Sequence, residues 1–225
     1  LYLLVFFNSL LIFSQEEKRL ALVIGNADYQ KGVLKNPVND AKLIAKTLDS
    51  LGFEVLEYYN LKTDRELKEA IRDFGAKREN TEFGFVYYAG HGIQINNQNY
   101  LLPTHQSFDS ESDIEFYAVS VQSILGFLEA KEDQVNILVL DACRDNPFEL
   151  NWKSSRSIKG DGLAKIPPPT GSLIAFSTDA GKTAADGEGE NSMYSKSLSK
   201  NMLIEDLDIY QVFGNVRSEV LAESK

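Results

Sequence analysis

Residues 83–92 read FGFVYYAGHG and residues 135–143 read VNILVLDAC, two apolar runs that each end in a reactive side chain. Such runs, without polar alternation, are typical of strands buried on both faces of a parallel sheet. Three further runs have the same character, at residues 19–26, 53–59 and 172–178. The stretches between several of these runs carry apolar residues at helical spacing. The alternation predicts an α/β fold, a mostly parallel sheet with helices on both faces.

The spacing of apolar residues predicts helices at residues 37–51, 64–74, 121–130 and 209–220. Thr63 and Glu66 form a capping-box pattern at the start of the second helix. The Gly90-His91-Gly92 turn is expected to end the strand that precedes it. Segments without a clear period are predicted to be loops or flexible, at residues 96–103, 144–171 and 184–191.

The composition limits the classes of function. The chain has 225 residues, of which 33 are acidic and 23 basic, giving a net charge of −10. This balance argues against nucleic-acid binding, which usually needs a clustered basic face. It is compatible with attraction of a basic substrate and equally with solubility alone. The single cysteine excludes an internal disulfide framework and a multi-cysteine metal cluster.

The first thirteen residues, LYLLVFFNSLLIF, include eleven apolar side chains. This run is too short to span a bilayer but suits the apolar region of a secretory signal. We expect residues 1–14 to be a signal peptide, the protein to be exported to the periplasm or beyond, and the mature chain to lack a stable membrane span. The alternative is an N-terminal strand or an uncleaved anchor, on a cytoplasmic or membrane-anchored protein. Both ends of the sequence are expected to be clipped.

Reactive residues follow two of the predicted strands. Ligands of open α/β sheets bind beyond the carboxyl ends of the strands, and consecutive strands are usually neighbours. His91 and Cys143 should therefore lie side by side, where the imidazole can take the proton of the thiol and make it a nucleophile. The amides of Gly92 and Cys143 are candidate donors to an oxyanion. The structural alternatives are a buried cysteine and a histidine in a plain turn. His105 is expected to be exposed or structural.

YYAGHG followed some fifty residues later by DACRDNP resembles the histidine and cysteine boxes of the caspase-like peptidases. The likeness is greatest to the bacterial metacaspase-like proteins called orthocaspases. It extends over about residues 19–220, through the landmarks RLALVIGN, LKNPVNDA, LGFEV, NYLLPT, DACRDNPF and SLIAFST. The resemblance implies a caspase-like three-layer sandwich and a cysteine endopeptidase that needs no cofactor. It also implies a peptidase domain over 15–225, with a large segment (15–150) and a small one (172–225) divided by a cleavable loop at 151–171.

Substrate preference is predicted from two carboxylates. Asp141 lies two residues before Cys143, on the same side of the strand end. By the resemblance, Asp40 matches the other acidic pocket residue of metacaspase-like enzymes. Such a pair would bind Arg or Lys and reject Asp, so we expect peptide or protein substrates cleaved after a basic residue. Asp40 also suits a helix N-terminus, which leaves a structural role open.

Two departures from the metacaspase pattern remove no catalytic group. Ala89 stands where Ser is common, and His105 stands where the NYLLPT segment usually continues with Asp. The acidic stretch at 109–115 lacks the spacing of a calcium loop, so we expect a solvated loop and no obligatory metal.

The loop before the last predicted strand carries candidate self-cleavage sites at Lys153, Arg156, Lys159 and Lys165. A solvated linker is the alternative. The competing function is a catalytically idle caspase-like interaction module, although such modules normally lose the His or the Cys. A nucleotide-binding or receiver-like domain is disfavoured because no phosphate-cradling motif is present, and a serine hydrolase would need a Gly-x-Ser-x-Gly elbow. No feature of the sequence indicates the oligomeric state.

Overall fold

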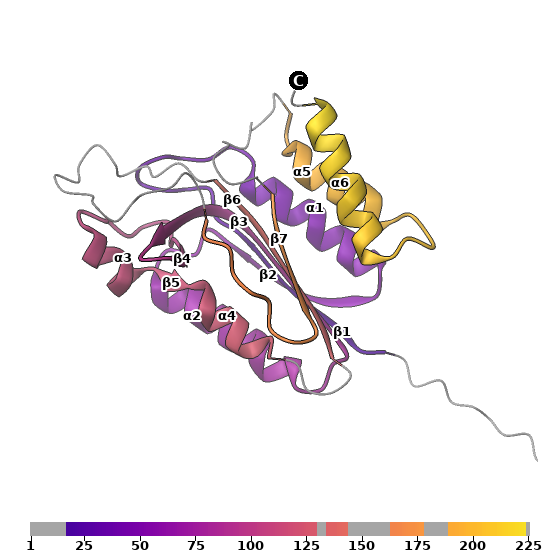
Figure 1. Cartoon of the computed structure of the whole chain (residues 1–225). Coiled ribbons are helices and arrows are strands. Elements are labelled where there is room, and N and C mark those ends of the chain that lie inside the picture. The colour runs from indigo at the N-terminus through magenta and orange to yellow at the C-terminus, as the bar shows by residue number, and fades with distance from the viewer. Residues whose placement is uncertain (1–16, 130–133, 144–162, 178–188, 224–225) are drawn as a thin grey trace, which may run out of the picture.

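The computed structural model of the chain describes residues 17–129, 134–143, 163–177 and 189–223 (Figure 1). A seven-stranded, mostly parallel sheet lies between two layers of helices. The predicted α/β class and the three-layer sandwich are confirmed. Among the described residues, no helix combines the length and the apolar character needed to cross a membrane.

Five strands of the sheet are parallel. In spatial order they are β2 (Phe53–Tyr59), β1 (Arg19–Gly25), β3 (Phe83–Ile95), β6 (Val135–Cys143) and β7 (Ser172–Phe176). Two short strands continue the sheet beyond the far end of β3: β4 (Gln98–Leu101) pairs antiparallel with β3, and β5 (Val119–Ser120) pairs antiparallel with β4. The central strands β1 and β3 are almost entirely buried, which is why they lack polar alternation.

Helices cover the two faces of the sheet (Figure 1). One face packs against α1 (Pro37–Ser50), α5 (Met193–Met202) and α6 (Ile209–Glu223). The other packs against α2 (Asp64–Arg78) and α4 (Val121–Phe127). A smaller apolar cluster lies around β4 and α3 (Glu111–Tyr117), and it contains Tyr29 of the segment between β1 and α1.

The start of α2 differs in detail from the predicted capping box. The Thr63 hydroxyl accepts the amide of Glu66 at 3.2 Å, as expected of an N-cap. The Glu66 carboxylate, however, accepts the amide of Lys62 at 2.6 Å rather than that of the cap residue itself. The pair still satisfies two amide donors at the start of the helix.

The expectation that Gly90-His91-Gly92 ends the third strand was wrong. The strand β3 continues to Ile95 because two neighbours supply backbone partners: β6 pairs with it as far as His91, and β4 pairs with it from Gly92 onward. For the same reason, the predicted loop over 96–103 contains β4. A strand with partners needs no side-chain alternation to stay extended.

The acidic stretch at 109–115 is helical from Glu111 onward rather than a solvated loop throughout. The Ser110 hydroxyl accepts the amide of Asp113, and the Asp113 carboxylate accepts the amides of Asp109 (2.9 Å) and Ser110 (2.8 Å). This reciprocal capping box opens α3 and gives one of the four acidic residues a local structural role.

The predicted exposed loop over 144–171 is only partly described, because residues 144–162 lie outside the described part of the chain. Leu163 and Ala164 are 7% and 6% exposed, so the chain is buried at this point, whereas residues 165–171 are exposed or partly exposed, as predicted. Asn99 on β4 holds it through two hydrogen bonds: its amide nitrogen donates to the Ala164 carbonyl (2.8 Å), and its oxygen accepts the Ala164 amide (2.7 Å). Lys165 follows with an exposed side chain.

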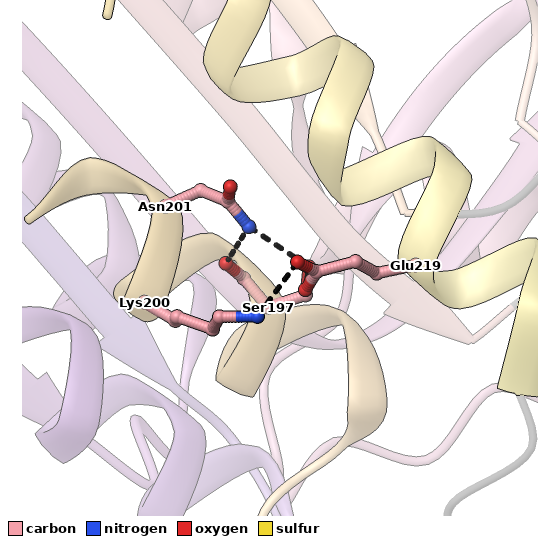
Figure 2. Close-up of polar contacts among 4 residues, drawn as sticks. All are labelled: Ser197, Lys200, Asn201 and Glu219. Carbon is pink, nitrogen blue, oxygen red and sulfur yellow. Dashed lines mark hydrogen bonds and ion pairs between the residues drawn. The ribbon is translucent and has the colours of Figure 1, made fainter. Parts of the chain in front are cut away.

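The helix α5 was not among the predicted helices. Its serines at positions 195, 197 and 199 are buried, and they bond to polar side chains of its neighbours. Figure 2 shows how α5 is joined to α6: Glu219 accepts hydrogen bonds from Ser197 (2.7 Å) and Lys200 (2.8 Å), and Asn201 donates to the Ser197 carbonyl. Only Tyr194, Leu198 and Met202 recur at helical spacing on α5, and the buried serines between them weaken that pattern in the sequence.

Candidate active site

The two predicted catalytic residues occupy paired positions on adjacent strands. In the parallel ladder between β3 and β6, His91 and Cys143 are register partners. Neighbouring strands lie about 4.8 Å apart, so the two backbones are adjacent although 52 positions separate them in the sequence. The side chain of Cys143 lies outside the described part of the chain. The expected juxtaposition of His91 and Cys143 on neighbouring strands is present in the backbone.

The imidazole of His91 is buried, with 3% of the residue exposed. Its Nε2 lies 2.6 Å from the carbonyl oxygen of Gly32 in the segment between β1 and α1. Because a carbonyl only accepts, Nε2 carries the proton in the neutral ring and Nδ1 is the basic nitrogen. Gly32 was not identified from the sequence, since a backbone carbonyl acts here and no side chain marks it.

Gly92 lies in a confined place beside the two strand ends. A Cβ built on it would be 3.0 Å from the Cβ of Ala142 and 3.3 Å from Cδ2 of Leu163. A side chain here would have to displace its neighbours, so glycine keeps the backbone of β3 close to β6 and to the Leu163 segment. Its role as an oxyanion donor remains a prediction.

The carboxylates of Asp40 and Asp141 are buried, at 2% and 9% exposure. Asp40, in the first turn of α1, accepts hydrogen bonds from the Asn191 side chain (3.0 Å) and the Ser192 amide (2.9 Å). Asp141, on β6, accepts from the hydroxyls of Tyr87 and Ser195, both at 2.9 Å, and of Ser192 at 3.4 Å. The two predicted pocket residues are therefore brought together.

Ser192 connects the two carboxylates. It is the N-cap of α5, its amide donates to Asp40 and its hydroxyl donates to Asp141. No lysine or arginine in the described ranges forms an ion pair with either carboxylate. Burial, and then the charge of Asp141, raise the pKa of Asp40 from 3.8 to about 6, and burial also raises the pKa of Asp141.

Ser192 and its neighbours Asn191 and Ser195 were not found as site residues from the sequence. The segment 184–191 was predicted to be flexible, and residues 184–188 lie outside the described part of the chain. Asn191, however, bonds to Asp40, and the carbonyl of Glu190 accepts a hydrogen bond from Asn39. A serine before a helix does suggest a cap, but only the fold reveals that this cap meets two carboxylates. His105 is exposed, as expected.

Comparison with known proteins identifies the family of the chain. The family model for the caspase domain of peptidase family C14 matches residues 18–225. The human mucosa-associated lymphoid tissue lymphoma translocation protein 1 and its mouse homologue are each 31% identical over 127 residues. The matched stretch is 56% of this chain and only 15% of each relative. The family match extends over almost the whole chain, and the three-layer sandwich and the pairing of His91 with Cys143 accord with it. The chain belongs to the caspase-domain family of peptidases.

Proposed function

We propose that this caspase-domain protein is a cysteine endopeptidase of the metacaspase-like type that cleaves peptide bonds after Arg or Lys. The observation that carries the proposal is the register of His91 with Cys143, which places a buried imidazole on the strand beside the single cysteine of the chain. An imidazole in hydrogen-bond reach of a thiol stabilises the thiolate, which is the nucleophilic form.

The proposed chemical steps use the imidazole of His91, the thiol of Cys143 and two backbone amides. Nδ1 of His91 takes the thiol proton of Cys143, and the thiolate attacks the scissile carbonyl carbon. The amides of Gly92 and Cys143 donate to the resulting oxyanion. The imidazolium then protonates the leaving amine as the C–N bond breaks, and an acyl-enzyme remains. Water, deprotonated by the same imidazole, hydrolyses the thioester and restores the thiol.

The preference for a basic residue rests on two buried carboxylates that share Ser192 and have no cationic partner among the described residues. A second negative charge in such a site is costly, as the raised pKa of Asp40 indicates. A guanidinium or ammonium group of the substrate would neutralise the pair and donate hydrogen bonds to the carboxylate oxygens. A substrate aspartate would add a third negative charge.

Self-cleavage between the large and small segments is part of the proposal. Lys153, Arg156 and Lys159 lie outside the described residues, and Lys165 is exposed. The backbone just before Lys165 is held by Asn99 at Ala164. A peptidase needs an extended backbone to bind, so we propose that cutting favours the three earlier sites over Lys165. Export, with removal of residues 1–14, is also retained as a proposal.

The test compares fluorogenic peptides that carry Arg, citrulline or Asp before the reporter. Citrulline has the shape of Arg without its charge, so it isolates the contribution of the carboxylates. We expect cleavage after Arg that is at least about a hundredfold faster than after citrulline, and that is lost in Cys143→Ala.

Equal rates for Arg and citrulline would remove the roles given to Asp40 and Asp141 while keeping the peptidase. A folded protein with a titratable thiol that cleaves none of the peptides would instead support the idle interaction module.

A further inference from the structure

We propose that Tyr29 is a positioning residue for the catalytic histidine: its hydroxyl holds the backbone of His91 and its ring packs against the imidazole. This inference rests on the proposed peptidase function. Tyr29 lies 62 positions before His91, in the segment between β1 and α1, and it is buried.

The first observation concerns a gap between two strand ladders. β1 pairs with β3 as far as Ala89, and β4 begins its pairing at Gly92. Gly90 and His91 lie between the two ladders. At this gap, the amide of His91 donates to the hydroxyl oxygen of Tyr29 at 2.9 Å. A side chain therefore supplies the hydrogen-bond acceptor that a neighbouring strand would otherwise supply.

The second observation concerns the ring. The centroids of the Tyr29 and His91 rings lie 4.4 Å apart at an interplanar angle of 57°. Tyr29 and Gly32 belong to one short segment, and the carbonyl of Gly32 accepts the hydrogen bond from Nε2 of His91. The segment is itself fixed, because the Ala27 carbonyl accepts the amides of Tyr29 (2.9 Å) and Leu34 (3.0 Å). One loop therefore controls both the backbone and the ring of the histidine.

The third observation concerns Tyr88, which bonds to the backbone carbonyl of His91, whereas Tyr29 bonds to its amide. Its hydroxyl donates to the carbonyl of His91 at 2.8 Å and lies 3.2 Å from the hydroxyl of Tyr29. A Cβ on Gly90 would be 2.6 Å from the Tyr29 oxygen and 2.9 Å from the Tyr88 oxygen, and Gly90 has φ +154°. Only glycine leaves room for both phenol hydroxyls beside the backbone at this position.

Tyr29 acts through position and not through proton transfer. Its hydroxyl accepts from the His91 amide and donates to the Leu102 carbonyl at 3.2 Å. Burial raises the pKa of Tyr29 well above its ordinary value, so the phenol stays neutral over the range in which a peptidase works. The expected contribution is a fixed Nδ1 direction, on which proton transfer from the thiol depends.

The kinetic test is Tyr29→Phe, which removes the hydroxyl and keeps the ring. The matched control is Tyr100→Phe, because Tyr100 is also buried and its hydroxyl donates to the Gln98 side chain rather than bonding to His91. We expect Tyr29→Phe to lower kcat at least about tenfold with KM changed less than about twofold, and the control to stay within about twofold in both. A kcat for folded Tyr29→Phe no lower than that of the control would overturn the inference.

A spectroscopic test separates this inference from the peptidase proposal. The chain has two histidines, so His105→Gln leaves His91 as the single imidazole. In a Cys143→Ala, His105→Gln background, ¹⁵N spectra of the ring should show one tautomer, with the proton on Nε2. Adding Tyr29→Phe should give a mixture of tautomers or exchange broadening. An unchanged single tautomer would contradict positioning, whether or not the protein proves to be a peptidase.

Tyr88→Phe serves if Tyr29→Phe does not fold. The carbonyl of His91 then keeps the amide of Leu102 as a donor at 3.2 Å, so this variant is the milder one. We expect a smaller loss of kcat, about threefold, and a detectable second tautomer. A wild-type tautomer and a wild-type kcat in Tyr88→Phe, with Tyr29→Phe unfolded, would count against the phenol pair as positioning groups.

Discussion

At the scale of single residues, the most consequential feature is a pair of buried carboxylates that have no cationic partner among the described residues. Asp40 is held by hydrogen bonds from Asn191 and Ser192, yet its pKa is raised to about 6, chiefly by burial and then by the charge of Asp141. A raised pKa for an acid means that the folded state resists ionisation more than the unfolded chain does. The site therefore carries a stability cost above pH 6 that a bound cation would offset.

We expect Asp40→Asn to stabilise the free protein at pH 8 while weakening cleavage after Arg. Both donors to Asp40 reach Oδ1, so the asparagine oxygen can accept them. With an unfolded pKa of 3.8 and a folded pKa of about 6, ionisation of Asp40 lowers the free energy of unfolding by up to about 3 kcal/mol above pH 6. The gain should shrink as pH falls through 6 and vanish below about 4. Thermal unfolding across this range measures it.

The control is Asp49→Asn, since Asp49 is an exposed carboxylate on the same helix. It should shift the unfolding temperature little at any pH. A variant at Asp40 that is less stable than wild type at pH 8 would show that ionised Asp40 stabilises the fold.

The sequence indicated His91, Cys143 and Asp141 because each lies at or near the carboxyl end of a predicted strand, where an α/β sheet places its site. It indicated Asp40 through the resemblance to metacaspase-like enzymes. It did not indicate Gly32, which acts through its carbonyl, or Ser192, which bonds to Asp40 through its amide and to Asp141 through its hydroxyl. Backbone groups are present at every position, so no residue type marks the ones that matter.

At the scale of elements, the Leu163–Ala164 segment shows how a loop can be fixed at one point. Both hydrogen bonds to Ala164 come from one side chain, Asn99, which is itself buried on β4. Leu163 joins the apolar cluster beneath α2 and α4 and approaches Gly92. The segment next to the candidate site therefore depends on a single amide side chain.

Asn99→Ala is expected to release this segment. The substitution leaves a buried amide and a buried carbonyl of Ala164 without their partner, at a cost of about 2 kcal/mol. In a Cys143→Ala background, brief digestion with trypsin should then cut after Lys165 at least about tenfold faster than in the parent, because local opening exposes the backbone. Mass spectrometry of the fragments identifies the cut.

A cut after Lys165 at the parental rate would show that Asn99 does not limit access to this bond. Gln98→Ala on the same strand is the matched control, because Gln98 is exposed and its side chain bonds to Tyr100 rather than to Ala164.

Elements with a long apolar period were predictable and the others were not. The helices α1, α2, α4 and α6 each bury an apolar stripe, as their spacing predicted. The helix α5 buries serines that bond to its neighbours, and β4 owes its conformation to pairing with β3. Both depend on distant residues, which local patterns do not report.

At the scale of the whole molecule, the net charge of −10 should influence how substrates arrive. We expect kcat/KM for a peptide of net charge +2 to fall severalfold as salt rises from about 0.01 M to about 0.3 M, because the Debye length shortens to less than 10 Å. A peptide with the same Arg at the cleavage site, brought to net zero by distant acidic residues, should respond less. Equal responses of the two peptides would rule out long-range steering.

The parallel order of the sheet was the most predictable property of the molecule, because buried strands separated by helices leave few alternatives. The same order fixes the register that brings His91 beside Cys143. The polar contacts between helices, such as the hydrogen bond of Thr47 with Ser199 at 2.7 Å, could not be predicted from the sequence and are seen only in the folded structure.

The position of β7 and α5 has a consequence for a molecule whose chain has been cut between β6 and β7. β7 lies along β6, and α5 is bonded to α1 through Ser199 and to Asp40 through Ser192. The two pieces would share one sheet and one set of polar contacts, so they would elute together in native chromatography and separate as two bands only after denaturation. Maturation would then change the covalent connectivity of the protein and leave its hydrodynamic size unaltered.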